Sequence, residues 1–230
     1  YGDEPRDAMV GNFARKPAYH FGWDWGPRYV TAGVWRGVDL QAWDAHRLTD
    51  LAVRTDALDA ENAKLAVVLQ VEQDAVAAPI AVDVEVRDPD GRSVARVQRT
   101  VELKPGRNSV EVPVELAKPR RWWPVGHGAQ DRYTVQARLD GSADAVLARE
   151  QRIGLRTVEL RREHDEKGGQ GFAFVINGVP IFAKGANVIP FDAFPARVDA
   201  ARLRQVLVAA RDANMNMLRN WGGGFYEDDA

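Results

Sequence analysis

The sequence predicts a mainly β protein built around an immunoglobulin-like β-sandwich of about 100 residues. Three observations predict this fold class. Hydrophobic residues alternate with polar ones from about residue 48 to residue 160, turn signals separate these runs, and a helical period appears only near residue 203. We therefore expect a sandwich in the middle of the chain, with different structures before and after it.

The composition excludes several classes of protein. Of the 230 residues, 45% are hydrophobic and 28% are charged, as in ordinary globular domains. The 31 Lys and Arg are balanced by 33 Asp and Glu, so no broad basic field would attract nucleic acid. The sequence lacks a run of about 18 apolar residues that would span a bilayer, and residues 1–7 do not resemble a secretory signal. We expect neither a nucleic-acid nor a membrane partner.

Metal and cofactor chemistry finds no support in the sequence. The absence of cysteine excludes disulfides, thiol nucleophiles and Cys-based metal sites. The histidines are scattered without the paired spacing of metal ligands: His20, His46, His127 and His164. We therefore expect no metal and no cofactor.

The first 45 residues are rich in aromatic side chains, and we interpret them as the tail of a preceding β-domain. Within them, residues 20–28 read HFGWDWGPR. If extended, this segment would place its aromatic side chains on one face and His20 and Asp24 on the other. The aromatic residues could be core, with Asp24 as a turn residue before Gly26-Pro27. Alternatively, Trp23 and Trp25 cover the apolar face of a sugar while Asp24 accepts hydrogen bonds from its hydroxyls.

The sandwich strands follow from the alternation. The turn sequence at residues 88–91, DPDG, favours a hairpin between the second and third of these strands. Residues 121–128, RWWPVGHG, are either a binding platform or, more simply, a structural loop whose two indoles pack at a domain junction. The strands are expected near residues 65–71, 82–86, 93–97, 110–116 and 133–139.

The pattern changes after residue 171. Asn177-Gly178 predicts a tight hairpin, and apolar residues at i, i+3, i+4 and i+7 from Leu203 predict a helix that Asp199 caps. A buried strand is expected over residues 214–218, so strand, helix and strand form a βαβ unit with parallel strands. Only 230 − 176 + 1 = 55 residues would then belong to an α/β barrel, which needs roughly 250. We therefore expect the chain to be a piece of a larger protein.

Polar and aromatic residues follow both strands of this βαβ unit. Asn187 follows the first strand, expected over residues 181–184, and Arg219 and Trp221 follow the second, at the strand ends where α/β barrels place their active sites. A guanidinium cannot be neutralised, so we expect a carboxylate near Arg219. Residues 227–229, EDD, could be a hydrolase carboxylate pair. Adjacent side chains diverge, however, and these residues fit better as the acidic first turn of a following helix.

Five motifs occur in a fixed order: HFGWDWGPR, RWWPVGHG, RIGLRTVEL, NGVPIFAKGANVIP and ANMNMLRNWGGGFYE. Together they closely resemble the β-mannosidases of glycoside hydrolase family 2, over nearly the whole chain. In that family a jelly-roll sugar-binding domain precedes an immunoglobulin-like sandwich and then a TIM barrel. The resemblance implies the end of the jelly roll at 1–45, the sandwich at 46–160 and the truncated start of the (β/α)8 barrel at 161–230.

The resemblance also implies retaining exo-hydrolysis of terminal β-D-mannose by two glutamates, an acid/base and a nucleophile. In the family both glutamates lie on later barrel strands, so we expect none of the catalytic pair in this chain and no activity from it alone. Trp23 and Asp24 resemble the pair that contacts the mannose, and Trp221 the aromatic wall of that subsite. Arg219 resembles the arginine that orients the nucleophile, and Asn187 an asparagine near the sugar. Two positions depart from the family pattern, and we assign them no binding role: Val188 and Asn220.

Two rival interpretations remain. The chain could be a non-catalytic carbohydrate-binding or scaffold module, or it could belong to a sibling β-galactosidase or β-glucuronidase, which lack the tryptophan-aspartate-tryptophan signature. The expected partner is a β-mannoside oligosaccharide. Apolar side chains around Val206, Leu207 and Leu218 would be exposed and favour self-association. The cysteine-free chain and a polysaccharide substrate favour an extracytoplasmic location.

Overall fold

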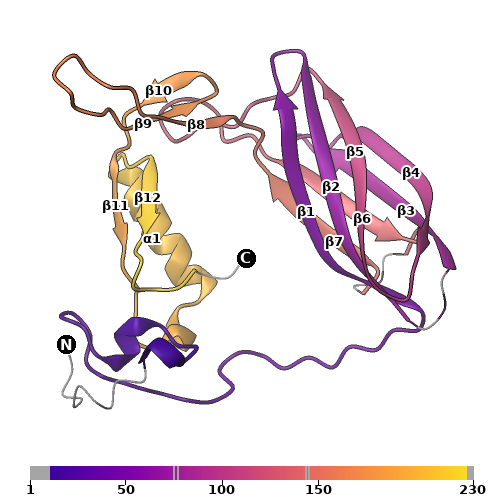
Figure 1. Cartoon of the computed structure of the whole chain (residues 1–230), viewed down its shortest axis with the longest axis horizontal. Helices are drawn as coiled ribbons and strands as arrows, with labels where there is room; N and C mark the ends of the chain where they lie inside the picture. Colours follow the sequence, from indigo (N-terminus) through magenta and orange to yellow (C-terminus); the bar gives the residue numbers. More distant parts are fainter. Residues whose placement is uncertain (1–10, 75, 77, 143, 145, 227–230) are drawn as a thin grey trace. The chain divides into compact units, whose positions relative to one another are not determined.

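The computed structural model describes residues 11–226 except 75, 77, 143 and 145, and the chain divides into two compact units (Figure 1). One unit is Leu40–Phe182. The other combines the described parts of Tyr1–Asp39 and Ala183–Ala230. The segments that precede and follow the sandwich in the sequence therefore belong to one unit.

The first unit contains the expected immunoglobulin-like sandwich, whose two sheets are wholly antiparallel. In one sheet β1 (His46–Leu58), β2 (Asn62–Gln73) and β5 (Gly106–Ala117) follow the order β1-β2-β5. The other has the order β4-β3-β6-β7. Its strands are β3 (Ala78–Arg87), β4 (Ser93–Leu103), β6 (Tyr133–Leu139) and β7 (Ala148–Ile153). The chain is mainly β, and the five alternating runs are strands, as the sequence predicts.

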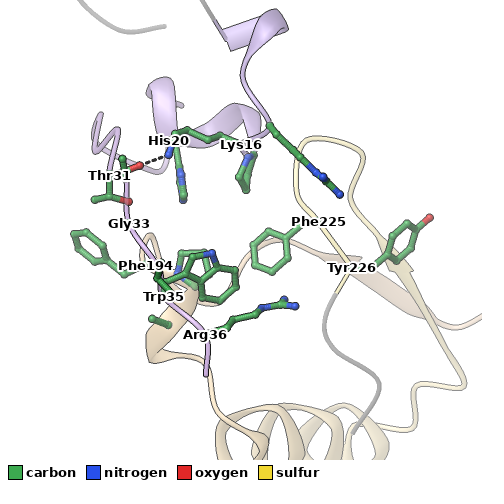
Figure 2. Close-up of a pocket in the computed structure, with 15 residues that line it drawn as sticks. Lys16, His20, Thr31, Gly33, Trp35, Arg36, Phe194, Phe225 and Tyr226 are labelled. Carbon is green, nitrogen blue, oxygen red and sulfur yellow. Dashed lines mark hydrogen bonds between the residues drawn. The ribbon is translucent and has the colours of Figure 1, made fainter. Parts of the chain in front are cut away.

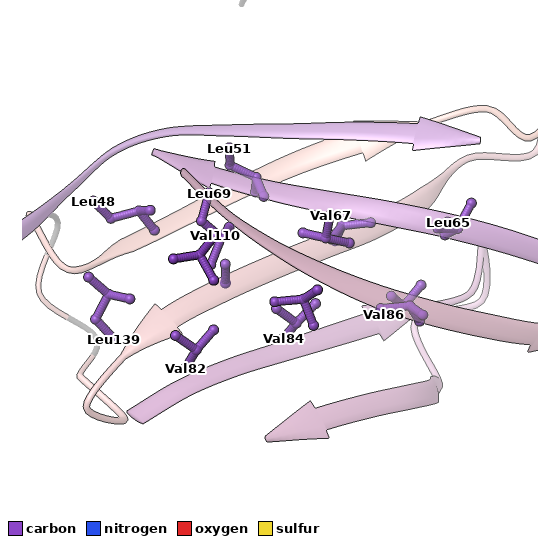
Figure 3. Packing of buried hydrophobic residues seen from close by; sticks show 14 of the residues in the cluster. Leu48, Leu51, Leu65, Val67, Leu69, Val82, Val84, Val86, Val110 and Leu139 are labelled. Carbon is purple, nitrogen blue, oxygen red and sulfur yellow. The ribbon is translucent and has the colours of Figure 1, made fainter. Parts of the chain in front are cut away.

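The core of the sandwich lies between the two sheets (Figure 3). Leu65, Val67 and Leu69 of β2 point toward Val84 and its neighbours on β3. These side chains are almost completely buried because every second residue of each strand faces inward. The period of two therefore places one apolar side of each sheet against the other.

The loop with two adjacent tryptophans is structural. Trp122 packs directly on Gly154, and the guanidinium of Arg156 lies 4.9 Å from its ring centroid. The main chain of Trp122 donates a hydrogen bond to the carbonyl of Leu155 and accepts one from the side chain of Asn177. These contacts lie within one unit and fit the interpretation of a structural loop.

A third, small sheet belongs to the same unit, in the order β10-β9-β8. The strands are β8 (Val158–Arg161), β9 (Ala173–Ile176) and β10 (Val179–Ile181). Asn177 has the positive φ of 51° that the predicted tight turn requires, and Val179 pairs with Ile176. The Asn177 side chain also accepts a hydrogen bond from the main chain of Thr157 at 3.0 Å. The hairpin prediction is therefore confirmed.

The second unit contains the predicted helix between two parallel strands. β11 (Gly185–Val188) pairs in parallel with β12 (Met217–Asn220), and α1 (Ala200–Asp212) lies between them in sequence. Asp199 caps α1 by accepting a hydrogen bond from the Arg202 N–H at 2.8 Å. Leu207 is exposed, whereas Val206 and Leu218 are half-buried. The described part of this unit also contains short 3-10 helices: η2 (Gly11–Phe13), η3 (Ala18–Phe21) and η4 (Pro195–Arg197).

A charged pair shields the outer face of the four-stranded sheet. Asp83 on the central strand β3 is only 8% exposed and accepts hydrogen bonds from Arg96 Nε at 2.9 Å and Nη2 at 2.6 Å. The Arg96 guanidinium, helped by Gln98 and Arg138, holds the pKa of Asp83 below its ordinary value, against the opposing effect of burial. The charged form of Asp83 is therefore the form that the fold stabilises.

This pair predicts a pH-dependent stability. Because the pKa of Asp83 is lower in the folded state, its contribution is complete above the unfolded pKa and is lost as the pH falls through the folded pKa. Asp83→Asn should lower the free energy of unfolding by about 1–2 kcal/mol at pH 7, measured in urea by circular dichroism. Below pH 4, the difference in the free energy of unfolding between Asp83→Asn and the parent chain should become smaller.

A matched control is Glu115→Gln, which neutralises an exposed cross-strand pair with Lys64 at 3.7 Å. It should change stability by less than about 0.5 kcal/mol. Equal effects of the two substitutions at pH 7 would show that the buried pair contributes no more than a surface one.

Candidate functional site

The tryptophan-rich segment forms a closed turn and is not extended. η3 ends at Phe21 and is followed by Gly22, whose φ is 99°. The main chains of Trp23 and Gly26 then exchange two hydrogen bonds, of 2.9 and 3.3 Å. Asp24 and Trp25 occupy the two central positions of this turn. Of the two conformations considered for this segment, the one with Asp24 as a turn residue is therefore the one observed. Gly22, with its positive φ, lets the chain change direction just before the turn. His20, expected on the face of Asp24, is instead buried against Tyr19.

The turn places three indoles together. The ring centroid of Trp221 lies 5.2 Å from that of Trp23 and 6.3 Å from that of Trp25, both edge-to-face. The ring centroid of Tyr19 lies 5.2 Å from that of Trp25. We name Trp23, Trp25 and Trp221 the tryptophan cluster. Residues almost 200 positions apart in the sequence thus form one aromatic surface, as the predictions for Trp23 and Trp221 require.

Asp24 is the exposed carboxylate beside this cluster. It sits between two members of the cluster in the sequence, and among the described residues it has no hydrogen-bond or ion-pair partner. Its two oxygens can therefore accept hydrogen bonds from a ligand. An exposed carboxylate next to half-buried indoles offers both the polar and the apolar contacts that a sugar needs.

Asn187 and Arg219 form a second pair at the neighbouring strand ends. They are register partners in the parallel pair β11–β12, and Arg219 Nη1 donates to Asn187 Oδ1 at 3.1 Å. Both residues lie inside their strands and not after them. β11 occupies residues 185–188 where the sequence predicts a strand over 181–184, and β12 ends two residues later than predicted. Trp221 directly follows β12 and donates its main-chain N–H to the carbonyl of Val188 at 3.1 Å. The strand pairing therefore fixes all three predicted residues in one small region.

The expected carboxylate beside Arg219 is not found in the described part of the chain. The guanidinium is exposed and hydrogen-bonds to the neutral amide of Asn187. A guanidinium has five N–H donors, so its fork can also bind an external carboxylate. The carboxylate expected near Arg219 therefore stays a prediction, which the resemblance assigns to a nucleophile outside this chain. Exposure removes the cost of leaving the charge without an anion here.

Trp25 is the member of the site to which the family resemblance assigns no role, although the sequence offers it, together with Trp23, as cover for the apolar face of a sugar. The signal was present, because Trp25 is the second tryptophan flanking Asp24. The acidic residues 227–229 lie outside the described residues. Within residues 11–226, apart from the four gaps, no three side chains are grouped as a metal site would need, and no helix is long and apolar enough to cross a membrane.

Comparison with known proteins places these features in a family. Residues 46–156 match the model of glycosyl hydrolases family 2, and residues 3–36 match the galactose-binding domain-like model of glycosyl hydrolase 2. The chain is 36% identical over 227 residues to a β-mannosidase of Bos taurus, and this match covers 95% of the chain. It is 38% identical over 230 residues to the β-mannosidase of Mus musculus. The chain spans 25% of the length of both relatives.

Solved structures agree with these matches. The β-D-mannosidase of Dictyoglomus thermophilum superposes with a TM-score of 0.88 at 39% identity, over 99% of this chain and 28% of that one. A protein described as a putative β-galactosidase from Bacteroides fragilis superposes with a TM-score of 0.66 at 16% identity, over 80% of this chain and 27% of that one. The second likeness concerns the fold alone.

Proposed function

Because the chain belongs to glycoside hydrolase family 2, we propose that it is part of a retaining exo-β-mannosidase and contributes contacts to the terminal mannose. The observation that carries the proposal is the exposed carboxylate of Asp24, held in a tight turn beside the tryptophan cluster. Carboxylate oxygens accept hydrogen bonds from adjacent hydroxyls, while indoles cover the C–H face of a pyranose. The β-mannosidases among the relatives support mannose as that sugar.

In the proposed mechanism this part of the protein positions the sugar and does not break its bond. A retaining glycosidase needs one carboxylic acid to protonate the leaving oxygen and one carboxylate to form the glycosyl-enzyme, with carboxyl groups about 5–5.5 Å apart. We propose that both are glutamates outside these 230 residues. Asp24 then holds the mannose, and Trp23 and Trp221 form the apolar wall that orients its ring.

Arg219 and Asn187 have a supporting role in this proposal. Asn187 accepts one hydrogen bond from Arg219 and so orients the guanidinium. The remaining N–H groups are then available to the nucleophilic carboxylate, which they would keep ionised and correctly oriented. Arg219 is thus proposed as a positioning residue, and Asn187 as its support near the sugar.

The proposed domains are the end of a jelly-roll sugar-binding domain at 1–45, the immunoglobulin-like sandwich at 46–160 and the beginning of a catalytic barrel at 161–230. Support comes from the family models, which match residues 3–36 and 46–156 separately. The parallel β11–β12 pair with its intervening helix is the kind of unit from which a (β/α)8 barrel is built.

The test is an assay of the intact parent protein and of the 230-residue chain on aryl β-mannoside, β-galactoside and β-glucuronide. We expect the parent to hydrolyse the mannoside with a kcat/KM at least roughly a hundredfold above that of the other two sugars. We expect no turnover by the 230-residue chain. Faster hydrolysis of the β-galactoside or the β-glucuronide would instead identify the parent as a β-galactosidase or a β-glucuronidase. Inactivity of the parent, together with mannose binding seen by calorimetry, would assign a non-catalytic binding module.

A further inference from the structure

A cavity of about 780 Å³ lies within the unit that combines Tyr1–Asp39 and Ala183–Ala230 (Figure 2). None of the proposed mannose-binding residues lines it. Its walls come from segments near residues 15–20, 31–36, 194–196 and 225–226. Its volume is within the range of about 300–1,000 Å³ that is usual for small-molecule sites.

The charged side chains that line this cavity are all basic. Arg15, Lys16 and Arg36 contribute positive charge, and none of the described lining residues is a carboxylate. The ammonium group of Lys16 donates to the carbonyl of Thr31, which holds it at the wall (Figure 2). Among the described lining residues the charge is therefore positive, which favours an anion.

His20 adds a buried polar group to the same wall. Its side chain lines the cavity and is only 7% exposed, yet neither ring nitrogen makes a hydrogen bond to any described residue. Burial, and then the nearby charge of Lys16, lower the pKa of His20. The main-chain carbonyl of Ala193 opposes this shift, but it does not meet the geometry of a hydrogen bond to either ring nitrogen. A buried polar side chain without a partner is costly, and a ligand that accepts a hydrogen bond would remove that cost.

The remaining wall is aromatic. Trp35, Phe194 and Phe225 surround the space below His20, and Trp35 is 52% exposed (Figure 2). Tyr29 stacks on Phe194 with 5.1 Å between ring centroids. Aromatic faces combined with a few convergent polar groups are suited to a sugar ring.

We propose that this cavity binds an anionic saccharide, a pyranose that carries a carboxylate or a phosphate ester. Lys16 and His20 contact the anionic group, and Trp35 and Phe225 contact the ring. The site is separate from Asp24, so the proposal stands whether or not the parent protein hydrolyses β-mannosides.

The test titrates the 230-residue chain by calorimetry with methyl β-glucuronide, mannose 6-phosphate, neutral methyl mannoside and inorganic phosphate. At least one charged sugar should bind roughly tenfold more tightly than both the neutral sugar and inorganic phosphate. Lys16→Met keeps the aliphatic stem but removes the charge, and it should weaken that binding roughly tenfold. The matched control Arg204→Met, on the exposed side of α1, should leave it unchanged.

A second readout follows the His20 imidazole by NMR. Its pKa should rise when the charged sugar is added, because the anion stabilises the imidazolium. The proposal is overturned if the neutral sugar binds equally well, if inorganic phosphate binds as tightly as the sugars, or if the two variants behave alike. An unchanged His20 titration in the saturated complex would also overturn it.

Discussion

Replacing Asp24 with alanine in the parent enzyme is expected to lower kcat/KM for an aryl β-mannoside by roughly a hundredfold or more. The carboxylate is exposed at the centre of the Trp23–Gly26 turn, and among the described residues it has no partner of its own. Its proposed role is to accept hydrogen bonds from two hydroxyls of the mannose. Without it, the sugar keeps its apolar contacts with the tryptophan cluster but loses the group that fixes its orientation.

Two further substitutions test whether the effect is specific to the Asp24 carboxylate. Asp24→Asn keeps the size of the side chain and one acceptor oxygen, so its loss of activity should be smaller than that of the alanine variant. Asp39→Ala removes another exposed carboxylate from the same unit and should leave the kinetics unchanged. Activity of Asp24→Ala within roughly threefold of the parent would contradict the assignment.

Stability distinguishes a binding role from a structural one. Because Asp24 is exposed, its replacement should change the free energy of unfolding by less than about 0.5 kcal/mol. Urea unfolding of the same samples measures this change. A kinetic loss accompanied by an equal loss of stability would identify Asp24 as a residue of the turn and not of the site.

The second large effect is expected at Gly185, the first residue of β11. A Cβ atom at this position would overlap the carbonyl oxygen of Met217, the register partner of Gly185 on β12. The obstacle is main chain on a paired strand, so no side chain can rotate away to make room. Gly185→Ala should therefore force the two strands apart and destabilise this unit by roughly 3 kcal/mol.

The same substitution should impair the proposed site at a distance. Asn187 and Arg219 are paired two residues further along β11 and β12, and Trp221 is held by a hydrogen bond to Val188. Separating the strands should reduce hydrogen-exchange protection of the Trp221 N–H and lower the activity of the parent enzyme. Gly37→Ala is the matched control, because the space around Gly37 is open. Full protection of the Trp221 N–H in Gly185→Ala would show that the strands tolerate a side chain there.

Local patterns were enough to predict much of the fold. The period of two in β2, β3, β5 and β6 reflects strands that bury one face, and Asn177-Gly178 is a turn whose geometry two residues determine. Asp199 caps α1 because the side chain reaches the main chain only three residues ahead. Each of these features depends on neighbours close in sequence.

The strands of the sandwich, the Asn-Gly hairpin, the capped helix and the residue types suited to a sugar site could therefore be predicted from local sequence. That Trp25 joins Trp23 and Trp221, and that Arg219 pairs with Asn187, became visible only in the folded chain. Periodicity and turn signals report interactions within a few residues. The tryptophan cluster and the Asn187–Arg219 pair depend on contacts between distant segments, which packing selects among many arrangements compatible with the same local pattern.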